Sequence, residues 1–228
     1  METFETQSDW AHLDEIREAL LPALLEGVIF SGWTEAALAT AARQTGIDPG
    51  AVELALPKGV ADMITYWSLR CDKIMQARFD QADTASMPVR EKVIFAVKAR
   101  LMAIGDENRD AAARATARLA LPDQVREGSR LLWRASDAIW RALDDSSTDF
   151  NYYSKRTILS AVLGSTLAVW FEGDDDKAFA FLDRRIENVM QFEKFKGKMR
   201  KKRELAGDPL ALLARLRYGT GRARRRRM

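Results

Sequence analysis

The stretch that decides the fold is TEAALATAARQTGIDPG, residues 34–50. Its small apolar residues Ala37, Leu38 and Ala41 recur at helical spacing, so one face of a helix over about 34–45 can pack on a core. The turn Gly46-Ile47-Asp48-Pro49 then joins it to a second short helix, expected at about 50–56. Two short helices linked by so brief a turn predict a helix-turn-helix unit.

The rest of the chain follows the same helical rule. Apolar residues recur mostly at helical spacing, and the six prolines lie at breaks between the apolar segments. We expect about nine helices and a further one in the tail, which is an all-α fold. The expected domains are a helix-turn-helix-like unit at 1–64, a helical bundle for ligand binding and dimerisation at 65–193, and a basic tail at 194–228 with an amphipathic helix at 208–218.

The stretch from Phe30 to about Met63 resembles the N-terminal unit of the TetR regulator family, which implies a TetR-like helical bundle. A DNA recognition helix needs side chains that donate to phosphates and base edges. The corresponding helix here, AVELAL at 51–56, has none, and Glu53 would repel phosphate. We therefore expect a scaffold kept for packing and no specific nucleic-acid binding. A TetR-type, ligand-responsive transcriptional regulator is the alternative hypothesis.

Composition excludes several kinds of chemical site. Cys71 is the single cysteine and His12 the single histidine of the 228 residues. These counts exclude an internal disulfide, a cysteine-based zinc site and a two-histidine metal site. No grouping of a nucleophile, a base and an orienting residue is recognisable. The sequence predicts a protein that is not an enzyme and holds no metal or cofactor; an enzyme acting on a quinone head group stays a third hypothesis.

Charge is divided unevenly along the chain. The net charge of +3 combines an acidic body with a basic tail, because residues 194–228 hold 14 of the 36 Lys and Arg residues and two acidic residues. Such a tail favours an anionic partner. The acidic start has no apolar signal segment, and the longest uncharged run, 157–171, is shorter than the roughly 20 residues that span a bilayer. We expect a cytoplasmic, bacterial-type protein, peripheral on the inner membrane.

Residues 131–171 are the most informative segment. The uncharged stretch 157–171 predicts a buried helix, and Ser160, Gly164 and Ala168 recur on it every four residues. This small-residue stripe either allows close helix packing or leaves room for a long apolar ligand. Tyr152 and Tyr153 stand before it beside Arg156, which is the composition of a protein–protein hot spot. Core packing of one tyrosine is the alternative.

Three motifs carry a family resemblance: LWxxxDxxW at 132–140, DxSTDFNYYxKR at 145–156 and FLDRRIxNVM at 181–190. Through them, about residues 10–195 resemble the ubiquinone (coenzyme Q) biosynthesis accessory protein family, also called the RpsU-divergently transcribed family. The resemblance implies a TetR-like homodimer that no longer regulates DNA. It also implies an apolar cavity for an isoprenoid quinone or phospholipid, which is presented to the di-iron demethoxyubiquinone hydroxylase.

The family pattern assigns roles to particular residues. The hydroxylase-docking surface would include Tyr152, Tyr153 and Arg156, although many members carry Trp-Tyr where this chain has Tyr152-Tyr153. By helical face, we expect the lipid cavity to be lined by residues of the two helices around 131–143 and 157–171. The expected lining residues are Leu132, Ile139, Ile158, Val162, Thr166 and Trp170.

The basic tail predicts a membrane contact. Asp208-Pro209 can start a helix whose leucines gather on one face, and polybasic segments flank it. An apolar face with nearby cations is typical of binding to an anionic membrane surface. The expected contact residues are Leu210, Leu212, Leu213, Leu216, Lys201, Lys202 and Arg203. Nucleic-acid binding and packing of this helix on the body or on a dimer mate are the alternatives.

Overall fold

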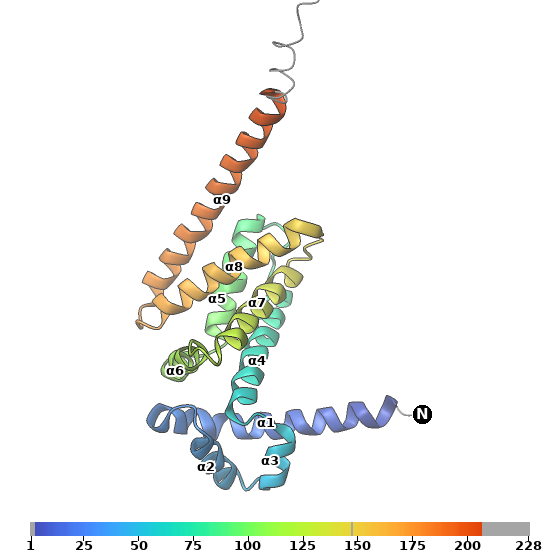
Figure 1. Ribbon diagram of the computed structural model, residues 1–228, viewed down its shortest axis with the longest axis vertical. Helices are drawn as coiled ribbons and strands as arrows, with labels where there is room; N and C mark the ends of the chain where they lie inside the picture. Colours follow the sequence, from blue (N-terminus) through green and yellow to red (C-terminus); the bar gives the residue numbers. More distant parts are fainter. Residues whose placement is uncertain (1–2, 147, 207–228) are drawn as a thin grey trace, which may run out of the picture. The chain divides into compact units, whose positions relative to one another are not determined.

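The computed structural model describes residues 3–146 and 148–206, and every regular element among them is helical, which confirms the predicted all-α class. Figure 1 shows these elements in chain order. They are α1 (Thr3–Ser31), α2 (Glu35–Thr45), α3 (Pro49–Ala55), α4 (Val60–Gln81), α5 (Val89–Met102), a 3-10 turn η1 (Asp106–Asn108), α6 (Arg109–Leu119), α7 (Val125–Ala142), α8 (Asp149–Trp170) and α9 (Asp175–Ala206).

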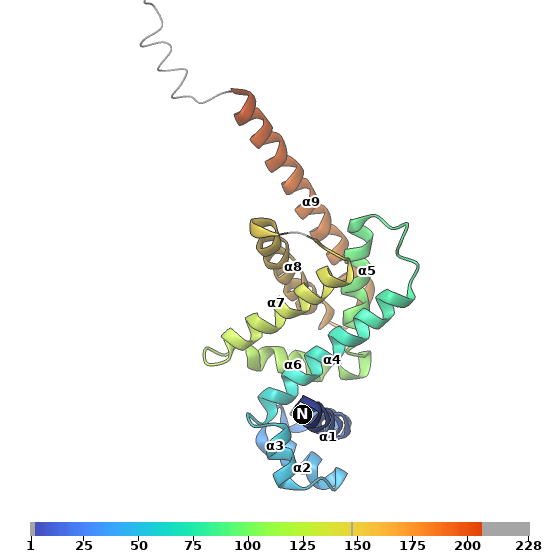
Figure 2. The same cartoon turned by 90° about the vertical axis from the view of Figure 1, so that its right-hand side faces the viewer.

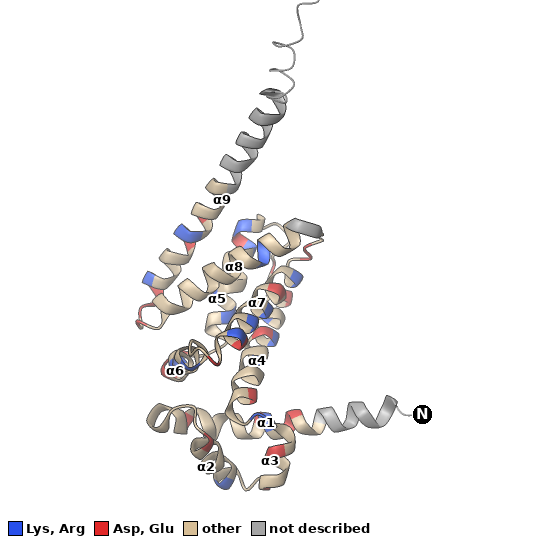
Figure 3. Cartoon of the chain, in the orientation of Figure 1, with Lys and Arg blue, Asp and Glu red and all other residues tan. Residues whose placement is uncertain are grey.

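The helix-turn-helix unit forms where the sequence predicts it. Thr34 caps α2 by accepting a hydrogen bond from the backbone of Ala37, and Gly46 ends the helix in the left-handed conformation that glycine adopts without strain. Asp48 then caps α3 by accepting from the amides of Gly50 and Ala51. The turn chemistry of residues 34–51 therefore sets both helix ends. Figure 3 shows that α3 carries an acidic residue and no basic one.

The N-terminal helices pack directly onto the rest of the body. The indole of Trp33 donates to the carbonyl oxygen of Ala111 in α6 at 2.9 Å, and its ring stacks on Trp67 of α4 with centroids 5.6 Å apart. The described residues up to 183 consequently form one compact unit, and those from 184 to 206 belong to another. This division differs from the expected boundary at residue 64, because buried aromatic contacts join the two sides of that position.

The helices that follow build a second layer within the first unit. α4 runs from the helix-turn-helix unit into the group formed by α5, α7 and α8 (Figures 1 and 2). α7 and α8 form a hairpin in which the hydroxyls of Ser136 and Ser160 lie 3.0 Å apart. Within the part of the chain that the structure describes, no helix has both the length and the apolar character needed to cross a membrane.

The expected tail helix at 208–218 lies outside the described residues, and so do Leu210, Leu212, Leu213 and Leu216. Lys201, Lys202 and Arg203 belong to the last turns of α9.

Candidate functional site

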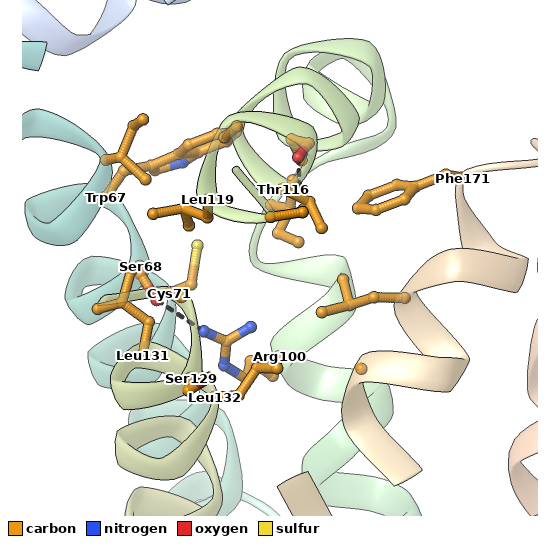
Figure 4. A pocket seen from close by; sticks show the side chains of 18 of the residues that line it. Trp67, Ser68, Cys71, Arg100, Thr116, Leu119, Ser129, Leu131, Leu132 and Phe171 are labelled. Carbon is orange, nitrogen blue, oxygen red and sulfur yellow. Dashed lines mark hydrogen bonds between the residues drawn. The ribbon is translucent and has the colours of Figure 1, made fainter. Parts of the chain in front are cut away.

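A cavity of about 300 Å³ lies among α4, α5, α6, α7 and α8 (Figure 4). Most of its lining is aliphatic or aromatic, including Trp67, Leu131, Leu132, Leu167 and Phe171. Alanine and glycine residues form part of the rest of the wall. Their side chains are too short to fill the space between the five helices, so a cavity remains. This lining suits an apolar ligand, since removal of apolar surface from water is the main favourable contribution to its binding.

The cavity opens between the end of α6 and the start of α7. Four lining residues are exposed to solvent, Thr116 and Ala120 on the α6 side and Val125 and Ser129 on the α7 side. The lining residues Trp67 and Leu131, by contrast, are buried. Leu121, between the two helices, is itself half-exposed, so apolar surface continues from the cavity to the outside of the molecule.

One charged side chain lies in this apolar wall. Arg100 of α5 is 5% exposed; its Nε donates to Oδ1 of Asp72 at 2.6 Å and its Nη2 donates to the hydroxyl of Ser68 at 3.0 Å. Burial opposes the charged form of Arg100, but the carboxylate of Asp72 outweighs it and raises the pKa of the guanidinium. Burial raises the pKa of Asp72, and Arg100 offsets part of that shift. Arg100 is therefore a cation held inside the cavity wall.

Of the six predicted lining residues, Leu132 lines the cavity and the other five do not. Ile139, Val162 and Thr166 are buried elsewhere, and the ring of Trp170 lies beneath the guanidinium of Arg109 at 4.2 Å. Ile158 is half-buried. α8 instead contributes Gly164, Leu167 and Phe171 to the cavity. The sequence could not select this face, because residues 157–171 carry no charge that would mark a solvent side.

The small-residue stripe on α8 divides between its two expected roles. Ser160 approaches α7 closely, since its hydroxyl contacts that of Ser136. Gly164 lines the cavity, where an added Cβ would lie 3.4 Å from Leu132. Ala168 is exposed. Ser160 therefore allows α7 and α8 to pack closely, whereas Gly164 leaves space for the cavity.

The predicted docking residues differ in exposure: Tyr153 is at the surface, Tyr152 is half-buried and Arg156 is buried. Tyr153 is 62% exposed and its ring lies 6.1 Å from that of Trp133. Tyr152 is half-buried and donates its hydroxyl proton to Asp137 at 3.1 Å. Tyr153, with the half-buried Trp133 beside it, is therefore the part of this region that a partner can reach.

Arg156 lies beneath that surface and is 2% exposed. Its Nε donates to Oδ1 of Asp137 at 2.6 Å, its Nη1 lies 3.6 Å from Oδ2 of Asp145, and its guanidinium covers the ring of Tyr152 at 3.5 Å. The charge of Arg156 is therefore already paired inside the fold, and its contact with a partner stays a prediction. Its contacts with Tyr152 support the surface from below.

Among the described residues, no cluster of three or more histidine, cysteine, aspartate or glutamate side chains is arranged to hold a metal ion. Cys71 lies in the cavity wall, where burial raises the pKa of its thiol. The thiol is thus kept in its protonated, weakly nucleophilic form.

Comparison with known proteins gives one consistent result. Residues 125–193 match the COQ9 family model. The chain is 27% identical to the mitochondrial ubiquinone biosynthesis protein COQ9 of Rattus norvegicus, over 82% of this chain and 62% of that protein. It is 26% identical to the Homo sapiens protein of the same name, over 82% and 61%. A probable ubiquinone biosynthesis protein coq9 of Dictyostelium discoideum is 25% identical over 80% and 62%. These matches confirm the predicted family resemblance.

The same relatives correct one expectation. They are named as mitochondrial proteins, so the expected cytoplasmic, bacterial-type localisation on an inner membrane is contradicted. That expectation depended on the acidic start of the sequence. The chain spans about 62% of the length of the relatives it matches.

Proposed function

Because this chain resembles the COQ9 proteins of ubiquinone biosynthesis, we propose that it is a non-catalytic accessory protein of that pathway, which binds an isoprenoid lipid in the α4–α8 cavity. The observation that carries the proposal is the apolar cavity itself, whose α7 and α8 walls lie inside the segment that matches the family model. Its volume of about 300 Å³ is at the lower end of the roughly 300–1,000 Å³ typical of small-molecule pockets.

The chemistry of the lining supports a carrier in preference to an enzyme. A quinone precursor with a long tail must be kept out of water while it moves between a bilayer and an active site. The cavity offers apolar walls, and its thiol is held protonated. In this proposal the redox chemistry belongs to the partner, a di-iron demethoxyubiquinone hydroxylase.

The partner would dock on the pair Trp133–Tyr153. Exposed aromatic rings are enriched among residues that dominate binding energy at protein interfaces. On α7, Trp133 directly follows the lining residue Leu132 and lies one turn after Ser129 at the cavity opening. A docked partner would therefore lie beside the cavity opening.

Two further parts of the proposal derive from the family resemblance and the sequence of the tail. The protein would act as a homodimer, and its tail would bind an anionic membrane surface through the leucines of 210–216 and the cations of 201–203. The transcriptional regulator is the less favoured hypothesis, because α3 lacks donors for DNA and the matched relatives are ubiquinone biosynthesis proteins.

Native mass spectrometry of the purified chain, followed by lipid extraction, tests the cavity. We expect a co-purifying isoprenoid lipid in the unaltered chain and its loss in Gly164→Leu, whose side chain would project into the cavity. Gly27→Leu is the matched control, since an added Cβ there meets nothing within 4 Å and the residue lies in α1, away from the cavity. Equal lipid loading of both variants, or no lipid in any sample, would contradict the proposal.

A further inference from the structure

Arg100 has a donor that the protein does not use. Its Nε and Nη2 are bound by Asp72 and Ser68, while Nη1 has no hydrogen-bond partner among the residues that the structure describes. Figure 4 shows the guanidinium reaching from α5 into the cavity, with one terminal nitrogen directed away from Ser68. Nη1 keeps some accessible surface although the residue as a whole is buried, so an acceptor atom of a ligand in the cavity can bind it.

The net charge of the cavity wall determines whether the hydrogen-bond acceptor for Arg100 is charged or uncharged. Asp72 and Arg100 form a pair whose carboxylate and guanidinium lie 2.6 Å apart, so their formal charges cancel. Arg134, which also acts on Asp72, is exposed, and neither it nor any Lys or Arg besides Arg100 is among the residues that line the cavity. A phosphate brought into this wall would therefore add an anion that no second lining cation balances, and burial of an unbalanced charge is strongly unfavourable. An uncharged carbonyl, hydroxyl or ether oxygen can accept from Nη1 without that cost.

Position within the cavity then sets the orientation of the ligand. Arg100 is almost wholly buried, whereas the opening beside Ala120 and Val125 is apolar and exposed. About 300 Å³ can take a ring and a short part of a tail, and a long isoprenoid chain would extend outward past Leu121.

Resting on the proposed function, we propose that Arg100 binds an uncharged oxygen of the ligand's ring, so that an uncharged, oxygen-bearing prenyl lipid enters ring first and is preferred over an anionic lipid. Arg100, Asp72 and Ser68 are then a specificity-determining group, with Arg100 touching the ligand and the other two positioning it.

This orientation constrains the handover. The ring would be covered while the lipid is bound and would have to leave the cavity before a partner could act on it. Ser129 at the opening and Trp133 at the docking surface are four residues apart on α7, or about 6 Å at 1.5 Å per residue. Release of the ring therefore occurs beside the surface on which the partner docks.

Three probes with the same tail test the selectivity by isothermal titration: a decyl-substituted benzoquinone, decylbenzene and decyl phosphate. A hydrogen bond to a charged donor contributes about 1.5 kcal/mol, so we expect the quinone to bind about tenfold more tightly than decylbenzene. Decyl phosphate should bind no better than decylbenzene. In Asp72→Leu/Arg100→Met, which removes both charges together, the tenfold preference should disappear while decylbenzene still binds.

Retention of the quinone preference in the double variant would overturn the role of Arg100, and tightest binding of decyl phosphate would overturn the preference for an uncharged group. Failure of all three probes to bind the unaltered chain would instead overturn the cavity proposal and this inference together. If the double variant does not fold, the arginine side-chain NMR signals of the unaltered chain decide: the quinone, and not decylbenzene, should shift one buried guanidinium, and equal shifts would contradict the inference.

Discussion

Two arginines of this protein are almost equally buried and yet differ in what they face. Arg156 lies under the docking surface between Asp137 and Asp145, with the ring of Tyr152 covering its plane. Arg100 contacts one carboxylate and one hydroxyl, and its remaining nitrogen is directed at a cavity. The first guanidinium is enclosed by its own fold, whereas the second has a donor available to a ligand. A buried charged side chain therefore indicates a binding site only when some of its hydrogen-bonding groups have no partner within the protein.

The largest expected effect tests the enclosed arginine. Arg156→Met would leave Asp137 and Asp145 without this cation inside the α7–α8 pair, and removal of one partner from a buried ion pair costs about 3–5 kcal/mol. We expect a loss of that size in the free energy of unfolding, measured by urea denaturation.

Arg141→Met is the matched control. Arg141 also pairs with Asp137, at 2.8 Å, but its side chain is largely exposed, so the loss should be below about 1 kcal/mol. If both variants lost the same stability, burial would not distinguish the two ion pairs and the assigned structural role of Arg156 would be wrong.

The next effect concerns the surface that Arg156 supports. Tyr153→Ala removes the exposed ring that lies against Trp133, and truncation of a hot-spot residue costs about 2 kcal/mol of binding energy. We expect about a 30-fold weaker complex with the demethoxyubiquinone hydroxylase by surface plasmon resonance. Phe30→Ala removes another exposed ring, at the end of α1, and should leave the affinity unchanged. Equal weakening by both variants would remove the docking assignment.

The fold was largely predictable because its signals are local. Caps at Thr34 and Asp48, the left-handed Gly46 and the apolar spacing of α2 are all visible in neighbouring residues. The close packing of the N-terminal unit on the body was not predictable, because the contact of Trp33 with Ala111 joins residues 78 positions apart. No local pattern encodes such a pair.

The site was predicted in part. The helices around 131–143 and 157–171 do border the cavity, but the lining face of α8 follows Gly164, Leu167 and Phe171. Arg100 was missed, although a signal for it exists. It falls in the apolar series of α5, seven residues after Val93 and four after Ala96, where a cation interrupts the core-facing stripe. Its partner Asp72 lies 28 residues away and could not be paired with it from the sequence.

The smallest expected effect is that of adding one methyl group to the wall of the cavity that Arg100 faces. Gly164→Ala and Gly27→Ala each replace a helical glycine where the added methyl group has room, since at Gly164 it would lie 3.4 Å from Leu132 and at Gly27 it meets nothing within 4 Å. Alanine restricts the unfolded chain more than glycine does, so each variant should gain about 0.4–1 kcal/mol of stability in thermal unfolding. Gly164 lines the cavity and Gly27 does not, so the alanine at 164 should also weaken decylbenzene binding, by a few-fold. A gain in stability at both positions with unchanged probe affinity at 164 would mean that the ligand does not occupy the space beside α8.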